Sequence, residues 1–185
     1  MNQEQIIHKG GAQLLANIAF KTDDAQTMRV VAGAIANLCG NEKVHSVLKE
    51  DGGIKAILAM TRYGNSDVIA QVARGLANFA KCESRGIARG WTKGKSLLIN
   101  EGALEWLITM SATASGSTRR HIDLALCHLA QNGDNMPDIM SSGGIKELFR
   151  LSQDTTREDI CNLAKKILNL NPTFLAGMEK PNSAT

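Results

Sequence analysis

The sequence predicts an all-helical solenoid made of about four copies of a three-helix unit. One motif joins an apolar helix end to the next apolar run through a small-residue turn, and its first glycines are Gly10, Gly52, Gly102 and Gly143. A second motif places a polar residue inside an apolar, alanine-rich helix, at Asn37, Asn78, His128 and Asn169. The turn glycines are 42, 50 and 41 residues apart, and the polar residues are 41, 50 and 41 apart. Two motifs that keep one register along the chain indicate a tandem repeat.

The repeat length and the helical periodicity narrow the fold class. A helical repeat of about 40–47 residues is typical of armadillo and HEAT arrays. Within the third helix of a unit, apolar residues recur at helical spacing, as Val31, Ile35 and Leu38 do. We therefore expect an all-α, right-handed superhelical solenoid of armadillo repeats whose third helices line the concave side.

The two motifs also set the boundaries of the units. We place the repeats at about residues 1–40, 41–82, 83–132 and 133–171, with the first one truncated. The third helix of the second repeat is expected to end near Cys82. Residues 172–185 begin with Pro172 and are expected to form a C-terminal cap and a disordered tail.

The composition fits one continuous helical core. The chain has 185 residues, of which 43% are hydrophobic and only 4% aromatic, which suits close helix packing more than a sandwich. No apolar run approaches the roughly 18–20 residues that cross a bilayer, and residues 1–5 lack the features of a signal peptide. The net charge of +3 does not indicate a nucleic-acid partner. We expect an intracellular protein without a transmembrane segment, with its four cysteines as buried free thiols.

The sequence contains no motif that indicates catalysis, a cofactor or a metal. Segment 90–96 has three residues between its glycines, whereas a phosphate-binding loop needs four. His121 and His128 are seven residues apart and share a helix face, but a zinc site would need two further ligands from neighbouring helices. We therefore expect no enzymatic activity, no cofactor and no metal site.

The third helices offer the first candidate binding surface. Their repeated asparagine could bond the backbone of an extended peptide, and polar residues lie four and seven positions earlier. The candidate groove residues are Asn37, Gln71, Arg74, Asn78, Arg120, His121 and His128. A groove that is polar to basic in its C-terminal half favours an acidic or phosphorylated partner. Alternatively, each polar residue satisfies only a carbonyl of a neighbouring loop.

An insertion in the third repeat offers the second candidate surface. This repeat is longer by about nine residues, and the excess lies between Cys82 and Leu97. Insertions in solenoids map to loops on one face, often the binding face. The candidate loop residues are Arg85, Arg89, Trp91, Lys93 and Lys95. The alternative is a solvated loop whose tryptophan folds back onto the core, and in either case we expect 85–95 to be the most mobile internal segment.

The repeats resemble those of the armadillo proteins importin-alpha and beta-catenin. The tryptophans of importin-alpha, four residues before each asparagine, are replaced here by Gly33, Arg74, Leu124 and Lys165. The strings at 29–41, 67–75, 77–85, 119–122 and 125–130 more closely resemble the C-terminal armadillo region of plant armadillo-repeat-containing kinesins. The resemblance covers roughly residues 6–175, and its most specific part is 78–85.

The resemblance implies a fragment of a larger protein, in which a motor and a coiled coil precede the armadillo region. Members of that family act on cytoplasmic microtubules in polarised plant cell growth. The resemblance also implies a protein partner: a NIMA-related kinase, or an organelle-bound cargo receptor. The fragment would be monomeric, and the parent protein dimeric through its coiled coil. The alternative function is a direct electrostatic contact of the 85–95 loop with a microtubule or a membrane surface, which salt would weaken steeply.

Overall fold

The computed structural model describes residues 3–171, so the expected cap and tail at 172–185 lie outside the described residues. Every regular element in 3–171 is a helix. The α-helices are α1 (Gln3–His8), α2 (Gly11–Lys21), α3 (Ala25–Leu38), α4 (His45–Glu50), α5 (Gly53–Ala59), α6 (Ser66–Ala88), α7 (Leu97–Asn100), α8 (Ala103–Thr113), α9 (Gly116–Ala130), α10 (Met136–Ser141), α11 (Gly144–Gln153) and α12 (Glu158–Leu170). The short 3-10 helices are η1 (Glu42–Val44), η2 (Met60–Arg62) and η3 (Gly133–Asn135).

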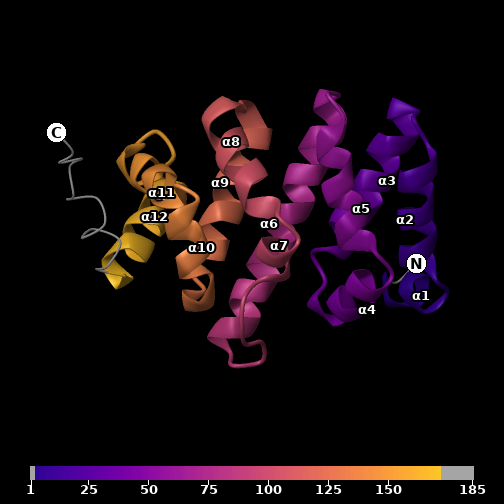
Figure 1. Cartoon of the computed structure of the whole chain (residues 1–185), viewed down its shortest axis with the longest axis horizontal. Coiled ribbons are helices and arrows are strands. Elements are labelled where there is room, and N and C mark those ends of the chain that lie inside the picture. Colours follow the sequence, from indigo (N-terminus) through magenta and orange to yellow (C-terminus); the bar gives the residue numbers. More distant parts are fainter. Residues whose placement is uncertain (1–2, 172–185) are drawn as a thin grey trace.

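The α-helices form four consecutive sets of three, which confirms the predicted fold class. Figure 1 shows these sets in chain order along the long axis, from α1 at one end to α12 at the other. Helix α1 has six residues, as α4 and α10 do. A 3-10 helix precedes α4 and another precedes α10, whereas the described part of the first repeat has none before α1.

The four turn glycines have the conformation that their sequence register suggests. Each precedes the second helix of its repeat in the left-handed region, with φ of 74° at Gly10, 78° at Gly52, 81° at Gly102 and 84° at Gly143. A Cβ at any of these positions would meet nothing within 4 Å. Glycine is therefore required for its backbone freedom, because a left-handed conformation strains residues that carry a Cβ.

The third helices α3, α6, α9 and α12 form a continuous row. Each packs against the next one more extensively than the corresponding second helices α2, α5, α8 and α11 do. A closer spacing within one row than within the other is the geometry expected when the third helices line the inner side of a curved solenoid. The side chains on this row are therefore the natural place to look for a binding groove.

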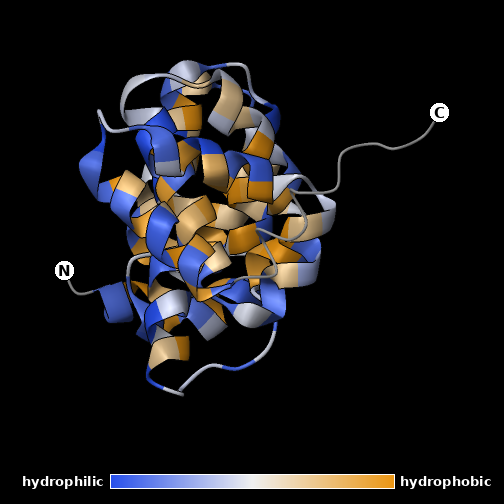
Figure 2. Cartoon of the chain, turned by 90° about the vertical axis from the view of Figure 1, so that its left-hand side faces the viewer, coloured by the Kyte–Doolittle hydropathy of each residue, from blue (hydrophilic) through white to orange (hydrophobic). Residues whose placement is uncertain are grey.

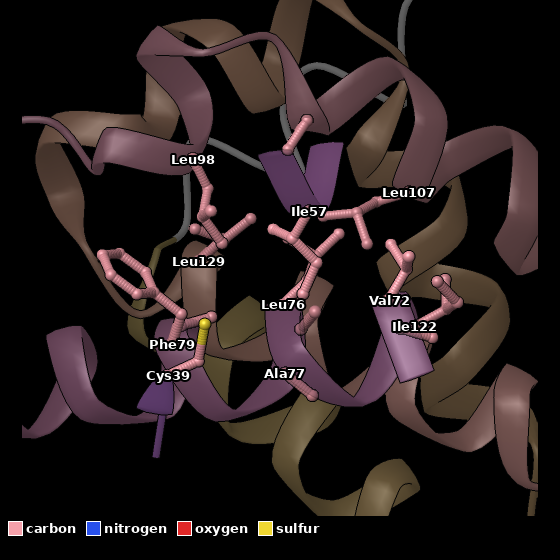
Figure 3. Packing of buried hydrophobic residues seen from close by; sticks show 14 of the residues in the cluster. Cys39, Ile57, Val72, Leu76, Ala77, Phe79, Leu98, Leu107, Ile122 and Leu129 are labelled. Atoms are coloured by element: carbon pink, nitrogen blue, oxygen red, sulfur yellow. The ribbon is translucent and has the colours of Figure 1, made fainter. Parts of the chain in front are cut away.

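The hydrophobic core crosses the boundaries between repeats. Figure 3 shows Ile57 of α5, Leu76 of α6 and Leu129 of α9 within one packed cluster, and all three are almost completely buried. Viewed from the C-terminal end, apolar residues gather at the centre of the molecule and polar ones around it (Figure 2). Since each repeat completes the core of the next, the described repeats stabilise one another.

A buried ion cluster joins the third and fourth repeats. The side chain of Asp123 on α9 is fully buried, and its carboxylate pairs with Arg157, just before α12. Arg119 Nε and Arg150 Nη2 lie 3.7 Å and 3.9 Å from the same carboxylate, and Ser111 Oγ of α8 donates a hydrogen bond to it at 2.5 Å. One carboxylate thus connects α8, α9 and α11 with the start of α12.

The outer members of this cluster balance its charge. Arg150 also pairs with Glu147 at 2.8 Å, and Arg157 with Asp154 at 2.6 Å. Hydrogen bonds from Thr156 and Arg157 lower the pKa of Asp154 to about 2. Three arginines therefore face three carboxylates, and Asp123 is the only one of the six that is completely buried.

No helix within 3–171 is long and apolar enough to cross a membrane.

The four cysteines are all buried and free, and burial raises the pKa of the Cys39 and Cys127 thiols to about 12. No group of three or more His, Cys, Asp or Glu side chains in the described residues could hold a metal ion.

Candidate partner-binding surface

The N-terminal half of the candidate groove is a hydrogen-bonded seam between α3 and α6. Arg74 Nη1 donates to Asn37 Oδ1 at 2.7 Å, and Arg74 Nη2 donates to the Gly33 carbonyl at 3.2 Å. The same guanidinium donates to Gln71 Oε1 at 2.8 Å from Nη2 and at 3.1 Å from Nε. Asn78 Nδ2 donates to the Ala36 carbonyl at 3.0 Å. The structure thus brings Asn37, Gln71 and Arg74 together, with Asn78 one turn further along α6.

At the repeated polar position, Asn78 satisfies a main-chain carbonyl as the alternative interpretation expects, but that carbonyl belongs to helix α3 and not to a loop. Asn78 and Arg74 each cap a main-chain oxygen of α3. The positive charge of Arg74 is nevertheless not neutralised, because no carboxylate in the described part of the chain forms an ion pair with it. Arg74 can therefore hold α3 and still attract an anionic ligand.

The C-terminal half of the groove contains two histidines on α9. Burial lowers the pKa of His128, and the positive charges of Lys81 and Arg85 lower it further. Burial also lowers the pKa of His121, with Arg74 and Arg120 adding to the shift. Both imidazoles are therefore mostly neutral at pH 7. Their positively charged neighbours lie on α6 and on α9 itself, and these two helices pack directly against each other.

Arg120 is the candidate groove residue whose charge is compensated. Its guanidinium forms a two-pronged ion pair with Asp159 at the start of α12, and this contact lowers the pKa of Asp159. Both side chains remain largely exposed, at 46% and 57%. Arg120 thus joins two neighbouring third helices at the surface, and its contribution to anion binding is reduced.

The inserted segment begins later than the sequence suggests. Helix α6 continues past Cys82 to Ala88, so the expected end of the second repeat at 82 falls within a helix and Arg85 is helical. Because position 86 is a glycine, the chain can fold back against the last turn of α6. A Cβ at this position would lie 2.6 Å from Thr92 Oγ1 and would clash with it. The Gly86 carbonyl then accepts a hydrogen bond from the Trp91 N–H at 2.8 Å. The loop proper is residues 89–96.

The tip of this loop is exposed. Trp91 is 67% exposed, so the alternative in which it folds back onto the core is wrong. The guanidinium of Arg89 lies 4.7 Å from the centroid of the Trp91 ring, a cation–π contact. Lys93 is exposed as well. Arg89, Trp91 and Lys93 therefore remain available as binding residues.

The second half of the loop is held by the fourth repeat. Lys95 pairs with Asp138 of α10 at 2.7 Å. Asn132 Nδ2 donates to the Gly94 carbonyl at 2.9 Å, and the Ser96 N–H donates to Asn135 Oδ1 at 2.8 Å. The ion pair neutralises Lys95. No hydrogen bond or ion pair joins residues 89–93 to residues 132–138, so this part of the loop is held only by its bonds to α6.

A cavity of about 330 Å³ lies beneath this loop, against α4 and α6. The His45 ring stacks on Phe79 at its wall, with ring centroids 4.1 Å apart, and burial lowers the pKa of His45. Both acidic and basic side chains line the cavity, among them Glu42 and Lys49. This mixture of charges favours no particular class of ligand.

A second cavity of about 330 Å³ is bounded by the C-terminal turns of α6, α9 and α12, and we call it the terminal cleft. Nothing in the sequence interpretation pointed to it, because the charges and glycines after Cys82 resemble a loop. The helical spacing of Phe79, Glu83 and Ile87 is the signal that could have revealed the longer helix. Lys81 lies inside the helix that the sequence predicts, but the repeat register singles out only positions 71, 74 and 78 of that helix as groove candidates.

Comparison with known proteins places the chain among plant sequences. No protein-family model matches it. It is 65% identical over 121 residues to the kinesin-like protein KIN-UA of Oryza sativa subsp. japonica, covering 65% of this chain and 13% of that protein. It is 59% identical over 122 residues to the kinesin-like protein KIN-UC of Arabidopsis thaliana, covering 66% and 12%. The chain thus spans roughly an eighth of the length of these relatives.

Solved structures share its fold at low sequence identity. Computationally designed armadillo repeat proteins for modular peptide recognition align with a TM-score of 0.72 and 22% identity, covering 91% of this chain and 68% of that one. A designed armadillo repeat protein in complex with the peptide (KR)4 aligns with a TM-score of 0.73 and 20% identity, covering 90% and 66%. These similarities show the armadillo-repeat solenoid.

Proposed function

We propose that this chain, an armadillo-repeat region homologous to a segment of the plant armadillo-repeat kinesins, recruits a protein partner to a microtubule motor. The chain itself is the non-catalytic binding part, and the motor would lie elsewhere in the longer protein. By resemblance the partner is a NIMA-related kinase or an organelle-bound cargo receptor. The assembly would work on microtubules in the cytoplasm during polarised growth.

The observation that carries this proposal is the uncompensated positive charge along α6. Arg74, Lys81 and Arg85 lie on one side of that helix, and no carboxylate among the described residues forms an ion pair with them. Their neighbours on α9 are two histidines with lowered pKa values. A row of cations next to neutral imidazoles attracts an acidic segment, and protonation of the histidines would strengthen that attraction.

The test begins with capture of the partner from plant extract on the immobilised chain, followed by identification by mass spectrometry. Affinity for the purified partner is then measured by titration. Replacing Arg74 and Asn78 together with alanine is expected to weaken binding at least tenfold, because it removes the uncompensated charge of Arg74 and a polar side chain one turn away, and each hydrogen bond to a charged group that the ligand loses costs about 1.5–3 kcal/mol.

The matched control replaces Arg89, Trp91 and Lys93 with alanine, and should change affinity little. Since Arg74 and Asn78 also bond α3, thermal unfolding of both variants must be recorded and binding measured well below the lower midpoint. The opposite pattern, with binding lost in the loop variant and kept in the groove variant, would make the loop the site. That result would favour the direct electrostatic contact with a microtubule or membrane surface.

A further inference from the structure

The terminal cleft exists because the third helices differ in length. Helix α6 has 23 residues, against 15 in α9 and 13 in α12. His128 corresponds to Asn78 in the repeat register, so α9 ends at Ala130 where α6 still has about two further turns to run. Those turns, including Ile87, extend past the end of α9 and form one wall of the cleft, while the end of α12 forms another. Ser84 still bonds Gln131, the residue that caps α9.

The terminal cleft has an apolar part beside polar side chains such as Ser84, Gln131 and Asn171. Ile87 of α6, Ala130 of α9, and Ile167 and Leu170 of α12 line it. Leu170 is 69% exposed, more than any other large hydrophobic residue among the described positions. Exposed leucine beside a hollow of this size leaves room for an apolar side chain from another molecule, whose burial is favourable.

The rim of the terminal cleft is positively charged. Lys166 lines the cleft from α12. Lys81 and Arg85 do not line the cleft themselves, but Arg85 directly follows Ser84, which does, and Lys81 lies one helical turn before Arg85 on α6. Both are close enough to His128 of α9 to lower its pKa. None of the three cations forms an ion pair with a carboxylate in residues 3–171, and no acidic residue lines the cleft. An anionic occupant is therefore favoured over a neutral or cationic one.

We propose that the terminal cleft binds an acidic peptide segment of the partner, with one apolar side chain inserted between Ile87 and Leu170. Carboxylates on either side of that anchor meet Lys81, Arg85 and Lys166. This assignment rests on the proposed function for the existence of a protein partner, and it adds the site and the chemistry of the bound segment.

The competing occupant is the chain's own C-terminal segment, which follows Asn171 at the edge of the cleft. Residues 172–185 contain Phe174 and Leu175, but their charged side chains are one Glu and one Lys. Those two charges cancel, and the terminal carboxylate of the 185-residue chain adds one negative charge. A segment with one net negative charge leaves at least two of the three cations unpaired. The charge of the rim thus favours the acidic partner segment.

The test uses three labelled synthetic peptides of equal length and the full 185-residue chain, with fluorescence anisotropy as the readout. The first peptide has a central leucine between glutamates, the second has lysine in place of every glutamate, and the third has serine in place of the leucine. The first is expected to bind at least tenfold more tightly than either of the others, with an affinity that falls as salt is added. Equal binding of the glutamate and lysine peptides, or no binding of the first peptide, overturns the proposal.

Two sets of variants locate the site. Lys81→Glu with Arg85→Glu is expected to weaken binding of the first peptide at least tenfold. Lys55→Glu with Lys146→Glu, the same charge change at exposed lysines on α5 and α11, should leave it within about threefold. Equal losses in both variants would reveal unspecific charge attraction and overturn the assignment.

Two further measurements separate the alternatives. A Phe174→Ser, Leu175→Ser variant should bind the first peptide as the unchanged chain does, whereas a tenfold gain would show that the chain's own segment occupies the cleft and would overturn the proposal.

The captured partner should lose affinity for the Lys81→Glu, Arg85→Glu variant. If it binds that variant normally, the terminal cleft is not its site, while the proposed function stands.

Discussion

Replacing Asp123 with alanine is expected to lower the free energy of unfolding by about 3–5 kcal/mol, because removing one partner of a buried ion pair leaves the other partner without its countercharge. Asp123 is completely buried and is approached by Arg119, Arg150 and Arg157. Without it, Arg150 and Arg157 keep Glu147 and Asp154, but Arg119, only 32% exposed, loses its carboxylate and one positive charge stays unbalanced at the junction of the third and fourth repeats. Urea unfolding followed by circular dichroism measures the loss.

The matched control is Asp159→Ala. Asp159 also pairs with an arginine of α9, but at the surface, where both side chains are about half exposed. Exposed ion pairs contribute at most about 1 kcal/mol. Similar losses in the two variants would contradict the role assigned to the buried cluster.

Replacing Gly75 with alanine is expected to destabilise the chain by about 1–3 kcal/mol, as overpacking of a close helix contact does. A Cβ at Gly75 would overlap Ile57 Cδ1 and lie 3.2 Å from both Cα and Cβ of Ala36 on α3. The backbone of α3 cannot retreat without disturbing the interface between the first two repeats. The gain of about 1 kcal/mol in helix propensity offsets only part of that cost.

Gly33→Ala is expected to change the free energy of unfolding in the opposite direction. A Cβ there would meet Gln71 Oε1 at 3.4 Å, an ordinary contact with a flexible side chain. We expect this variant to be about 0.5–1 kcal/mol more stable, since alanine favours the helix. Chemical unfolding of both variants is the measurement, and a change of the same sign in both would contradict the packing argument for Gly75.

The fold could be predicted because its determinants are local and repeated. A glycine in the left-handed conformation at Gly10, Gly52, Gly102 and Gly143, together with apolar residues at helical spacing, marks each unit in the sequence itself. The end of α6 could not be predicted in this way. Gly86 and the charges around it resemble a loop, whereas the helix end is supported by Glu83, which accepts a hydrogen bond from the Leu97 N–H beyond that loop, and by Thr92 of the loop, whose N–H bonds the Gly86 carbonyl.

The binding surface was predictable in position but not in detail. Register alone places Arg74 and Asn78 on the third helices, yet their bonds to α3 depend on how closely two repeats approach. Asp123 resembles a surface residue in the sequence, because Arg150 and Arg157 join it from 27 and 34 positions away. The terminal cleft depends on the unequal lengths of α6, α9 and α12, which no single segment encodes.

We propose that a protein partner binds the row of third helices, from Arg74 on α6 to the terminal cleft. The most direct test is nuclear magnetic resonance of the isotope-labelled chain while the purified partner is added. We expect the amide signals that shift most to belong to residues 81–88, 128–131 and 166–171, the ends of α6, α9 and α12. Shifts confined to the loop at 89–93, with the third helices unchanged, would contradict it.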